Sequence, residues 1–273
     1  MSDFTRRVAQ TVGKHFVTLS CIQYPPADSP SKVLVFSGFM VDVSGEWFYV
    51  TAGHILRKIR TALSSGSSFD IWRLDDQTAG NRFNGKAVPY DFVSEDWLVL
   101  EDASTGLDYA AVHLSDFYRR QLEVGGVTAI ARKAWSDHVT EYDHWVLFGI
   151  PSETIEYDGE TVITGRVVML PLVPADEPTL AGHKANNQFY AKPIDGSAQI
   201  FEDADGMSGG PVFILKKVKE QWLYGVIGVQ SAWYPPSRTF AICPFSSFGL
   251  ALEQLVAETP AIQAQSLDAS NAA

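Results

Sequence analysis

Positive charge and cysteine are both scarce in this sequence of 273 residues. Lys and Arg together number 21 against 32 Asp and Glu, which gives a formal net charge of −11. Nucleic-acid phosphates are bound by clustered Lys and Arg, so this balance argues against a nucleic-acid partner. The two cysteines, Cys21 and Cys243, lie too far apart in the chain to indicate a disulfide framework.

Long apolar runs are missing as well. No stretch approaches the roughly 20 apolar residues of a membrane-spanning helix. Residues 1–16 contain no apolar core of the length found in signal peptides. We therefore expect a cytoplasmic protein with reduced thiols and no membrane partner.

The residues that are present favour a β-rich globular fold. Hydrophobic residues make up 46% of the chain and charged residues 19%, a composition typical of a packed domain. Short runs of β-branched and aromatic residues recur between turn signals, which predicts barrels or sandwiches. The strands that we expect span 15–22, 33–43, 47–51, 68–73, 87–92, 97–100, 110–114, 127–131, 145–149, 161–172, 188–193, 211–215, 222–230 and 239–243, and the helices span 55–63, 117–124 and 247–257.

Three short motifs carry chemistry. Their sequences are Thr-Ala-Gly-His at 51–54, Leu-Asp-Tyr-Ala-Ala-Val at 107–112 and Gly-Met-Ser-Gly-Gly-Pro at 206–211. A serine hydroxyl needs an adjacent imidazole to take its proton, and that imidazole needs a carboxylate to fix its tautomer. The motifs supply these groups as Ser208, His54 and Asp108. Asp108 is preferred over other nearby aspartates because it directly precedes an apolar run, where a buried carboxylate needs a partner.

The glycines around Ser208 predict an oxyanion hole. Glycine at 206, 209 and 210 permits backbone conformations that other residues avoid, so the loop can turn its N–H groups toward a small anion. We expect the backbone N–H groups of Gly206 and Ser208 to hold the oxyanion of an acyl-transfer reaction. Pro211 and the apolar residues after it predict a loop that enters a strand.

The order of the three groups excludes one alternative. In α/β-hydrolases the histidine follows the nucleophile, and a helix comes directly after the serine. No histidine follows Ser208, and a β-type run comes after it. The order His, Asp, Ser and the three motifs together resemble the trypsin/chymotrypsin-like serine proteases, and the chain looks closer to bacterial members that lack disulfides.

This resemblance implies an all-β fold of two six-stranded antiparallel β-barrels with a C-terminal helix. It implies one barrel over 14–125 carrying His54 and Asp108, and a second over 126–257 carrying Ser208. We expect the tail over 258–273 to be disordered because it is small and polar. The implied activity is that of a serine endopeptidase that cuts protein or peptide substrates through an acyl-enzyme, without a cofactor.

The sequence departs from the family at the residue that controls activation by cleavage. Met207 stands where secreted members have the Asp that accepts a new N-terminal ammonium, and the start of the chain does not resemble their activated N-terminus. Activation by cleavage is therefore not expected. Two alternatives remain open: apolar packing of Met207 prefolds the loop, or a partner protein orders and activates it.

The substrate pocket is predicted from the resemblance alone. Glu202, six residues before the nucleophile, corresponds to the pocket floor, and Arg238 lies in a segment that resembles the back wall. The strand segment Gly228, Val229 and Gln230 corresponds to the lining of the cleft. Glu202 favours a basic substrate side chain, whereas Arg238 favours an acidic one, and a surface location for both charges is an equal alternative.

Two further expectations concern metals and alternative functions. His15, His138 and His183 show no ligand spacing with Cys or carboxylates, so no metal site is expected. Besides peptide hydrolysis, the motifs allow a latent or inactive protease-like module that binds peptides, and an esterase that uses the same triad.

Overall fold

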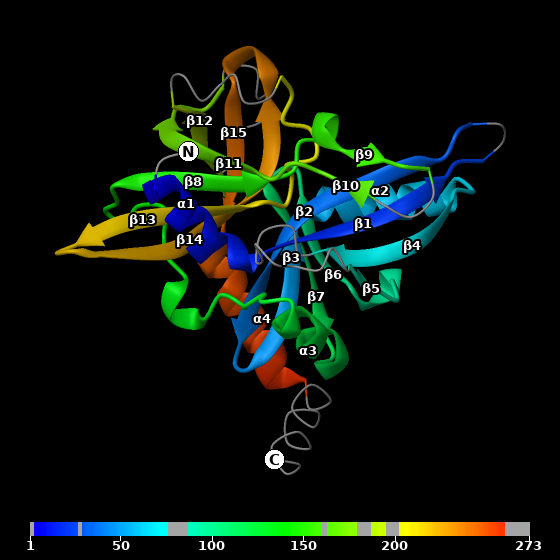
Figure 1. The fold of residues 1–273 in the computed structure, drawn as a ribbon, viewed down its shortest axis with the longest axis horizontal. Helices are drawn as coiled ribbons and strands as arrows, with labels where there is room; N and C mark the ends of the chain where they lie inside the picture. Colours follow the sequence, from blue (N-terminus) through cyan, green and yellow to red (C-terminus); the bar gives the residue numbers. More distant parts are fainter. Residues whose placement is uncertain are drawn as a thin grey trace, which may run out of the picture.

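The structure is a computed structural model, which describes residues 3–26, 29–75, 87–159, 163–178, 187–194 and 202–259. These residues form two β-rich halves that pack against each other, followed by a C-terminal helix (Figure 1). The all-β class, a closed six-stranded antiparallel barrel and the C-terminal helix are confirmed.

The N-terminal half is a seven-stranded antiparallel sheet in the order β5-β4-β1-β2-β3-β7-β6. Its strands are β1 (Phe16–Tyr24), β2 (Lys32–Val43), β3 (Glu46–Thr51), β4 (Ser68–Asp75), β5 (Val88–Pro89), β6 (Leu98–Asp102) and β7 (Leu107–Leu114). The resemblance implied six strands here, and the seventh is β5, which corresponds to the strand expected over 87–92 but is only two residues long and pairs only with the end of β4.

The C-terminal half is a closed barrel in the order β11-β12-β15-β14-β13-β8. Its strands are β8 (His144–Gly149), β11 (Val168–Ala175), β12 (Phe189–Pro193), β13 (Pro211–Val218), β14 (Gln221–Tyr234) and β15 (Thr239–Pro244), and a small hairpin of β9 (Glu156–Tyr157) and β10 (Ile163–Thr164) lies outside it. Large apolar side chains such as Leu147, Leu170 and Ile227 are fully buried in its interior. Closure of the barrel pairs every strand on both edges.

In the described residues, four α-helices and five 3₁₀ turns connect and cover the strands. The helices are α1 (Asp3–Val12), α2 (Gly53–Ser64), α3 (Asp116–Val124) and α4 (Phe245–Glu258), and the turns are η1 (Gly13–His15), η2 (Ser94–Asp96), η3 (Arg132–Ala134), η4 (Ser152–Thr154) and η5 (Pro235–Ser237). Of the helices that the structure describes, none has the length and apolar character needed to span a bilayer.

Three segments differ from the elements predicted by the sequence. The strand expected over 127–131 is wrong: the segment makes only a bridge from Ile130 to Val41 of β2. The strand expected over 161–172 divides into β10 and β11, with 161–162 outside the described residues. The sequence analysis assigned no element to the residues of α1, and 260–273 of the predicted tail lie outside the described residues.

Helix α4 joins the two halves. It follows directly from β15 of the barrel and packs against β14 and β2, so it contacts both halves (Figure 1). Phe245 at its start meets Phe39 of β2 edge-to-face with ring centroids 5.6 Å apart. Phe248 stacks on Tyr109 of β7 at 4.5 Å. This shared apolar core fixes β7 beside the barrel, which matters because β7 also carries Asp108.

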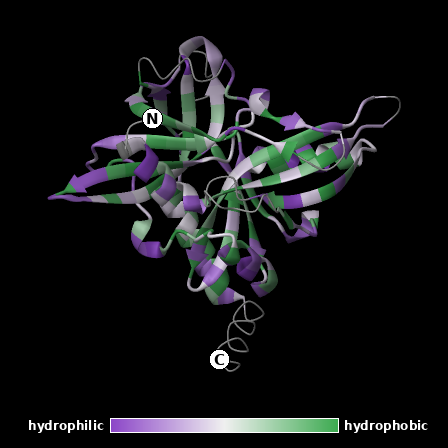
Figure 2. Ribbon diagram, in the orientation of Figure 1, coloured by the Kyte–Doolittle hydropathy of each residue, from purple (hydrophilic) through white to green (hydrophobic). Residues whose placement is uncertain are grey.

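Polar residues gather away from this core. Figure 2 shows hydrophobic residues along the strands of both halves and a hydrophilic tip on the long hairpin of β13 and β14. That tip contains Lys216, Lys217 and Lys219, the densest group of lysines in the sequence. Two of these lysines are paired: Lys216 with Glu141 at 2.9 Å and Lys217 with Glu220 at 3.3 Å.

The positions of the two cysteines make a testable prediction. Both thiols are free and fully buried, and burial raises the pKa of Cys243 to about 12 and also raises that of Cys21. The thiolate is the reactive form. A disulfide reagent such as DTNB at pH 8 should therefore leave both thiols unmodified in the native protein and modify both after denaturation. Rapid reaction of either thiol in the native protein would contradict this packing.

Candidate active site

The pairing of β3 with β7 brings the predicted base and acid together. Thr51, the last residue of β3, pairs with Ala110 of β7. His54 lies three residues beyond Thr51, and Asp108 lies two residues before Ala110 on the antiparallel strand. Helix α2 begins at this point, so His54 occupies its first turn.

A glycine allows α2 to approach β7 closely. A Cβ atom at Gly53 would lie 2.9 Å from the carbonyl oxygen of Tyr109 and 3.1 Å from Oδ1 of Asp108. The backbone N–H groups in the first turn of a helix have no partner within the helix. The N–H of His54 is one of these, and it donates to Oδ1 of Asp108 at 2.7 Å.

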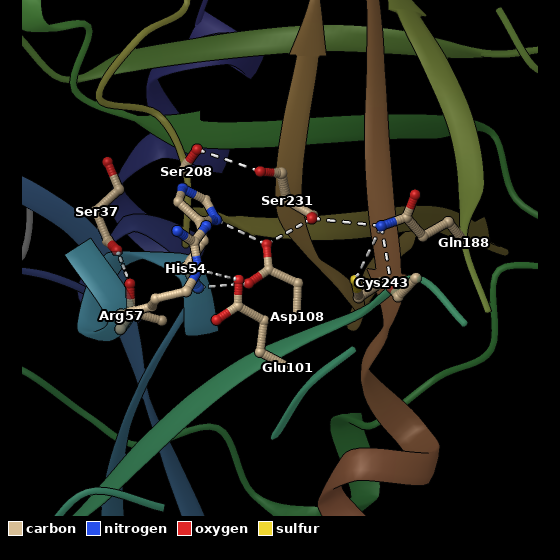
Figure 3. Close-up of polar contacts among 11 residues, drawn as sticks. Ser37, His54, Arg57, Glu101, Asp108, Gln188, Ser208, Ser231 and Cys243 are labelled. Atoms are coloured by element: carbon tan, nitrogen blue, oxygen red, sulfur yellow. Dashed lines mark hydrogen bonds and ion pairs between the residues drawn. The ribbon is translucent and has the colours of Figure 1, made fainter. Parts of the chain in front are cut away.

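Asp108 also accepts hydrogen bonds from two side chains. The Nδ1–H of His54 donates to Oδ2 at 2.8 Å, and the hydroxyl of Ser231 donates to the same oxygen at 2.6 Å (Figure 3). A carboxylate only accepts, so the ring nitrogen must carry the proton, which leaves Nε2 of neutral His54 as an acceptor. The side chains of His54 and Asp108 are 17% and 9% exposed, so the pair is largely screened from water.

These contacts decide the charge of Asp108. Burial would raise the pKa of the carboxyl group, but the hydrogen bond and charge of His54, the hydroxyl of Ser231 and the backbone N–H of His54 outweigh it. The pKa of Asp108 is therefore held below its ordinary value. The carboxylate is ionised at neutral pH and can stabilise positive charge on His54.

Ser231 was missed by the sequence analysis. It lies on β14 at a β-bulge between Gln230 and Ala232, and bulges re-aim side chains next to functional sites. Its hydroxyl also accepts a longer bond of 3.4 Å from the amide of Gln188 (Figure 3). The predicted strand ended at Gln230, and no local signal in the sequence announces a bulge there.

Ser208 lies in the loop that enters β13. Its hydroxyl donates to the carbonyl oxygen of Ser231 at 3.4 Å, a long bond (Figure 3). Ser208 and His54 line the same two cavities, of about 760 Å³ and 530 Å³. The structure thus brings Ser208, His54 and Asp108 together at the 530 Å³ cavity. The serine hydroxyl is turned toward the carbonyl oxygen of Ser231.

The loop around Ser208 is fixed by backbone conformation and packing. Gly206 and Gly209 have φ of 88° and 87°, which disfavours any residue with a Cβ atom. A Cβ at Gly209 would collide with the Thr51 hydroxyl and the Ser37 carbonyl oxygen. Met207 is fully buried in the barrel interior, which supports the alternative in which apolar packing prefolds this loop.

The peptide that contains the Gly206 N–H is held from its other edge. The carbonyl oxygen of Asp205 accepts a hydrogen bond of 2.7 Å from the backbone N–H of Ser152. Because a trans peptide is planar, the N–H of Gly206 points to the opposite edge. Neither this N–H nor that of Ser208 donates to any acceptor in the described ranges, as an oxyanion donor requires.

Ser37 is a second residue that sequence reasoning missed. Its buried hydroxyl donates to the carbonyl oxygen of Gly206 at 2.9 Å and accepts from the backbone N–H of Ile150 at 3.0 Å. Its own carbonyl oxygen accepts from the hydroxyl of Thr51 at 2.8 Å. Ser37 thereby ties the loop before Ser208 to the strand end that leads into His54.

The predicted substrate-pocket residues do not gather around these two cavities. Glu202 is exposed, Val229 is buried in the shared core, and Gly228 packs against Ile242. Gln230 is fully buried, with no hydrogen-bond partner for its side-chain amide in the residues described. Arg238 ends η5 in a left-handed conformation and lies 5.5 Å from the ring centroid of Trp233.

The lining of the 530 Å³ cavity comes from different residues. Besides the three motif residues, Ser231, Ala232 and Trp233 of β14 line it, as do Asp203 and Asp205. The part of β14 that lines this cavity is therefore residues 231–233, which directly follow the expected segment 228–230. No group of three or more His, Cys, Asp or Glu suited to a metal ion occurs among the described residues.

No protein-family model matches the chain, and no curated protein matches it. Among solved structures the chain resembles a thermostable serine protease AL20 from an extremophilic microorganism, with 13% identity over 91% of this chain and 99% of that one and a TM-score of 0.47.

Two other solved structures are similar over most of the chain. Protease Anisep from Arthrobacter nicotinovorans has 14% identity over 85% of this chain and 90% of that one, with a TM-score of 0.45. A catalytically inactive tobacco etch virus protease in complex with substrate has 10% identity over 85% and 78%, with a TM-score of 0.40. All three TM-scores lie below 0.5.

The low pKa of Asp108 predicts how stability changes with pH. A carboxyl group whose pKa is lower in the folded state stabilises that state above its unfolded pKa, about 3.9, and loses this contribution as pH falls through the folded value. The free energy of unfolding of the native protein should therefore exceed that of Asp108→Asn at about pH 5, where the carboxylate is ionised in both the folded and the unfolded state. The difference should shrink below about pH 4.

Denaturant titrations of both proteins across this range measure the difference directly. A gap that widens as pH falls below about 4 would show that Asp108 is not stabilised in its charged form. Asp116→Asn, on the exposed start of α3, is the matched control and should give a much smaller gap.

Proposed function

We propose that the protein is a trypsin-like serine endopeptidase. The observation that carries this proposal is the cluster in which Asp108 accepts from both the backbone and the ring of His54 and from Ser231. This cluster lies beside Ser208, on two cavities that meet at the serine. The three sequence motifs lie on separate strands and loops, and each contributes one residue to this site.

The reaction begins with Ser208. Its hydroxyl turns from the carbonyl oxygen of Ser231 toward Nε2 of His54, which accepts the proton as the oxygen attacks the peptide carbonyl carbon. The carbonyl oxygen becomes an oxyanion, which the N–H groups of Gly206 and Ser208 hold. His54 then returns the proton to the leaving amine, and the acyl group remains on Ser208.

The acyl-enzyme is released by the same groups. His54 takes a proton from a water molecule, whose oxygen attacks the ester carbonyl, and the proton returns to Ser208 as the acid product leaves. Asp108 stays ionised throughout and stabilises the imidazolium that forms twice per cycle. No step requires a cofactor.

The nucleophile makes the first functional prediction. Ser208→Ala should lower kcat for peptide hydrolysis by roughly 10⁴-fold or more because members of a triad act as a unit. Ser104→Ala, in the exposed turn between β6 and β7, is the matched control and should retain full activity. Hydrolysis is followed with a library of quenched fluorescent peptides and mass spectrometry of the products.

The same assay separates the alternatives. Turnover of simple esters but of no peptide would favour an esterase with the same triad. Peptide binding without turnover, unchanged in Ser208→Ala, would favour a latent peptide-binding module. Turnover that appears only after a second protein is added would favour the alternative in which a partner orders the loop.

Ser37 makes a second functional prediction. Ser37→Ala removes the hydroxyl that holds the Gly206 carbonyl oxygen and leaves the buried N–H of Ile150 without its acceptor. We expect kcat to fall about tenfold or more, with a smaller change in KM, because the oxyanion stabilisation acts in the transition state. Stability should fall by about 1–3 kcal/mol.

A control separates orientation from general loosening. Ser20→Ala removes another buried hydroxyl, which bonds Asp75 in β4 away from the loop. It should cost comparable stability and leave kcat unchanged at a temperature where all variants are folded. Equal losses of activity in both variants would show that Ser37 has no positioning role.

A further inference from the structure

The larger cavity is a cleft between β2 and α2. It has a volume of about 760 Å³, and one end is lined by His54, Gly206 and Ser208. We call it the α2 cleft, and its apolar walls are formed by Val33, Val35, Phe36, Ile55, Ile59 and Phe69. None of these six residues belongs to the three sequence motifs.

The carbonyl group of Ser231 indicates which part of a substrate enters this cleft. When the Ser208 hydroxyl turns toward His54, the carbonyl oxygen of Ser231 loses its donor. The residue whose carbonyl is attacked carries an N–H group within a few ångströms of the reacting carbon. That N–H can replace the hydroxyl, which places the acyl part of the substrate along Ser231 and Ala232 in the 530 Å³ cavity. The leaving part then extends the other way, into the α2 cleft.

The length of the cleft suits a peptide segment. Ser37, which contacts the Gly206 carbonyl, and Lys32, which lines the cleft, are five residues apart on β2. At about 3.3 Å per residue this is roughly 16 Å. An extended segment of about five residues after the scissile bond spans the same distance, so a four-residue segment fits within it.

Two lysines line the cleft, and one of them, Lys58, also lines the 530 Å³ cavity. Lys32 lies near the start of β2, and Lys58 lies one turn beyond His54 on α2. Both are exposed and have no ion-pair partner in the described residues, whereas the neighbouring Arg57 is paired with Glu101 at 2.7 Å. The acidic residue that lines the cleft, Asp205, lies at the nucleophile end. In a chain of net charge −11, two unpaired lysines in one cleft favour an acidic ligand.

We propose that the α2 cleft binds the segment that follows the scissile bond and selects segments with a bulky apolar side chain and a carboxylate. The apolar walls take the bulky side chain, and Lys32 and Lys58 attract the carboxylate at the second to fourth position after the bond. The inference rests on the proposed function and adds the substrate class on the leaving side.

Matched peptides test the charge preference. All share one acyl half and one apolar residue after the bond, and they carry Glu, Gln or Lys at the third position of the leaving segment. We expect kcat/KM for the Glu peptide to exceed that for Gln by about three- to tenfold, and Lys to be the poorest. The ratio should shrink in 0.5 M salt because exposed charges are screened. Mass spectrometry confirms that the same bond is cut in all three.

Two variants locate the preference in the cleft. The double variant Lys32→Gln/Lys58→Gln should bring the Glu to Gln ratio close to one. Lys133→Gln, an exposed lysine on η3 outside the cleft, should leave the ratio as it is. The ratio is used because a change in the catalytic step itself affects both peptides equally.

A third pair of variants tests occupancy. Ala62→Phe places a ring in the cleft, whereas Leu63→Phe adds a ring on the exposed side of the same helix turn. Ala62→Phe should raise KM several-fold for peptides with a four-residue leaving segment. It should not change KM for p-nitroanilides, which have no leaving segment, and Leu63→Phe should change neither.

The outcomes separate the two proposals. Cleavage that is indifferent to the leaving segment in the native protein, or unaffected by these variants, would overturn the α2 cleft proposal and leave the peptidase proposal standing. If the native protein cleaves nothing, binding of the free Glu and Gln peptides by fluorescence anisotropy decides the cleft proposal. A Glu preference that Ala62→Phe abolishes would support a peptide-binding cleft, and no preference would overturn it.

Discussion

One buried carboxylate holds the site together. Asp108 is reached by donors from both halves of the molecule: His54 at the start of α2 in the N-terminal half, and Ser231 on β14 in the barrel. A buried carboxylate is costly unless its oxygens are paired. Each donor therefore stabilises the ionised carboxylate. The ionised carboxylate in turn requires that β7, α2 and β14 keep their relative positions, because each of these elements carries one of the bonded groups.

The loop that carries Ser208 is held by a parallel set of constraints. Ser37 connects its Gly206 carbonyl to β2, Ser152 bonds the Asp205 carbonyl, and Met207 fills the barrel interior. Secreted members of the family that the motifs resemble have a charged Asp at the position of Met207. Here neutral hydrogen bonds and apolar packing occupy that place. This arrangement favours a loop that is shaped before any substrate or partner arrives.

The sequence predicted those functional residues that lie in recognisable local motifs. The motif around His54, the apolar run after Asp108 and the glycines near Ser208 identify themselves by composition, and the structure brings them together. Ser231 and Ser37 could not be found in this way, because their roles depend on a bulge and on contacts between strands far apart in the chain. The 530 Å³ cavity is lined by residues 231–233 of β14 and not by Gln230.

Long-range pairing also explains the differences in the fold. Short runs of β-branched and aromatic residues predicted most strands, but the length of a strand depends on its pairing, so the strand expected over 87–92 is only the two-residue β5 at the edge of the sheet. The division into domains over 14–125 and 126–257, the cytoplasmic location and an activating partner stay predictions, because they concern properties that contacts within one chain do not report.

The central claim is that this geometry makes Ser208 a reactive nucleophile. The most direct measurement is to treat the native protein with a fluorophosphonate, digest it and map the adduct by mass spectrometry. The account predicts a single adduct on Ser208, formed far more slowly in Asp108→Asn, whose amide favours the wrong tautomer of His54. An adduct on another residue, or labelling of Asp108→Asn at the native rate, would contradict it.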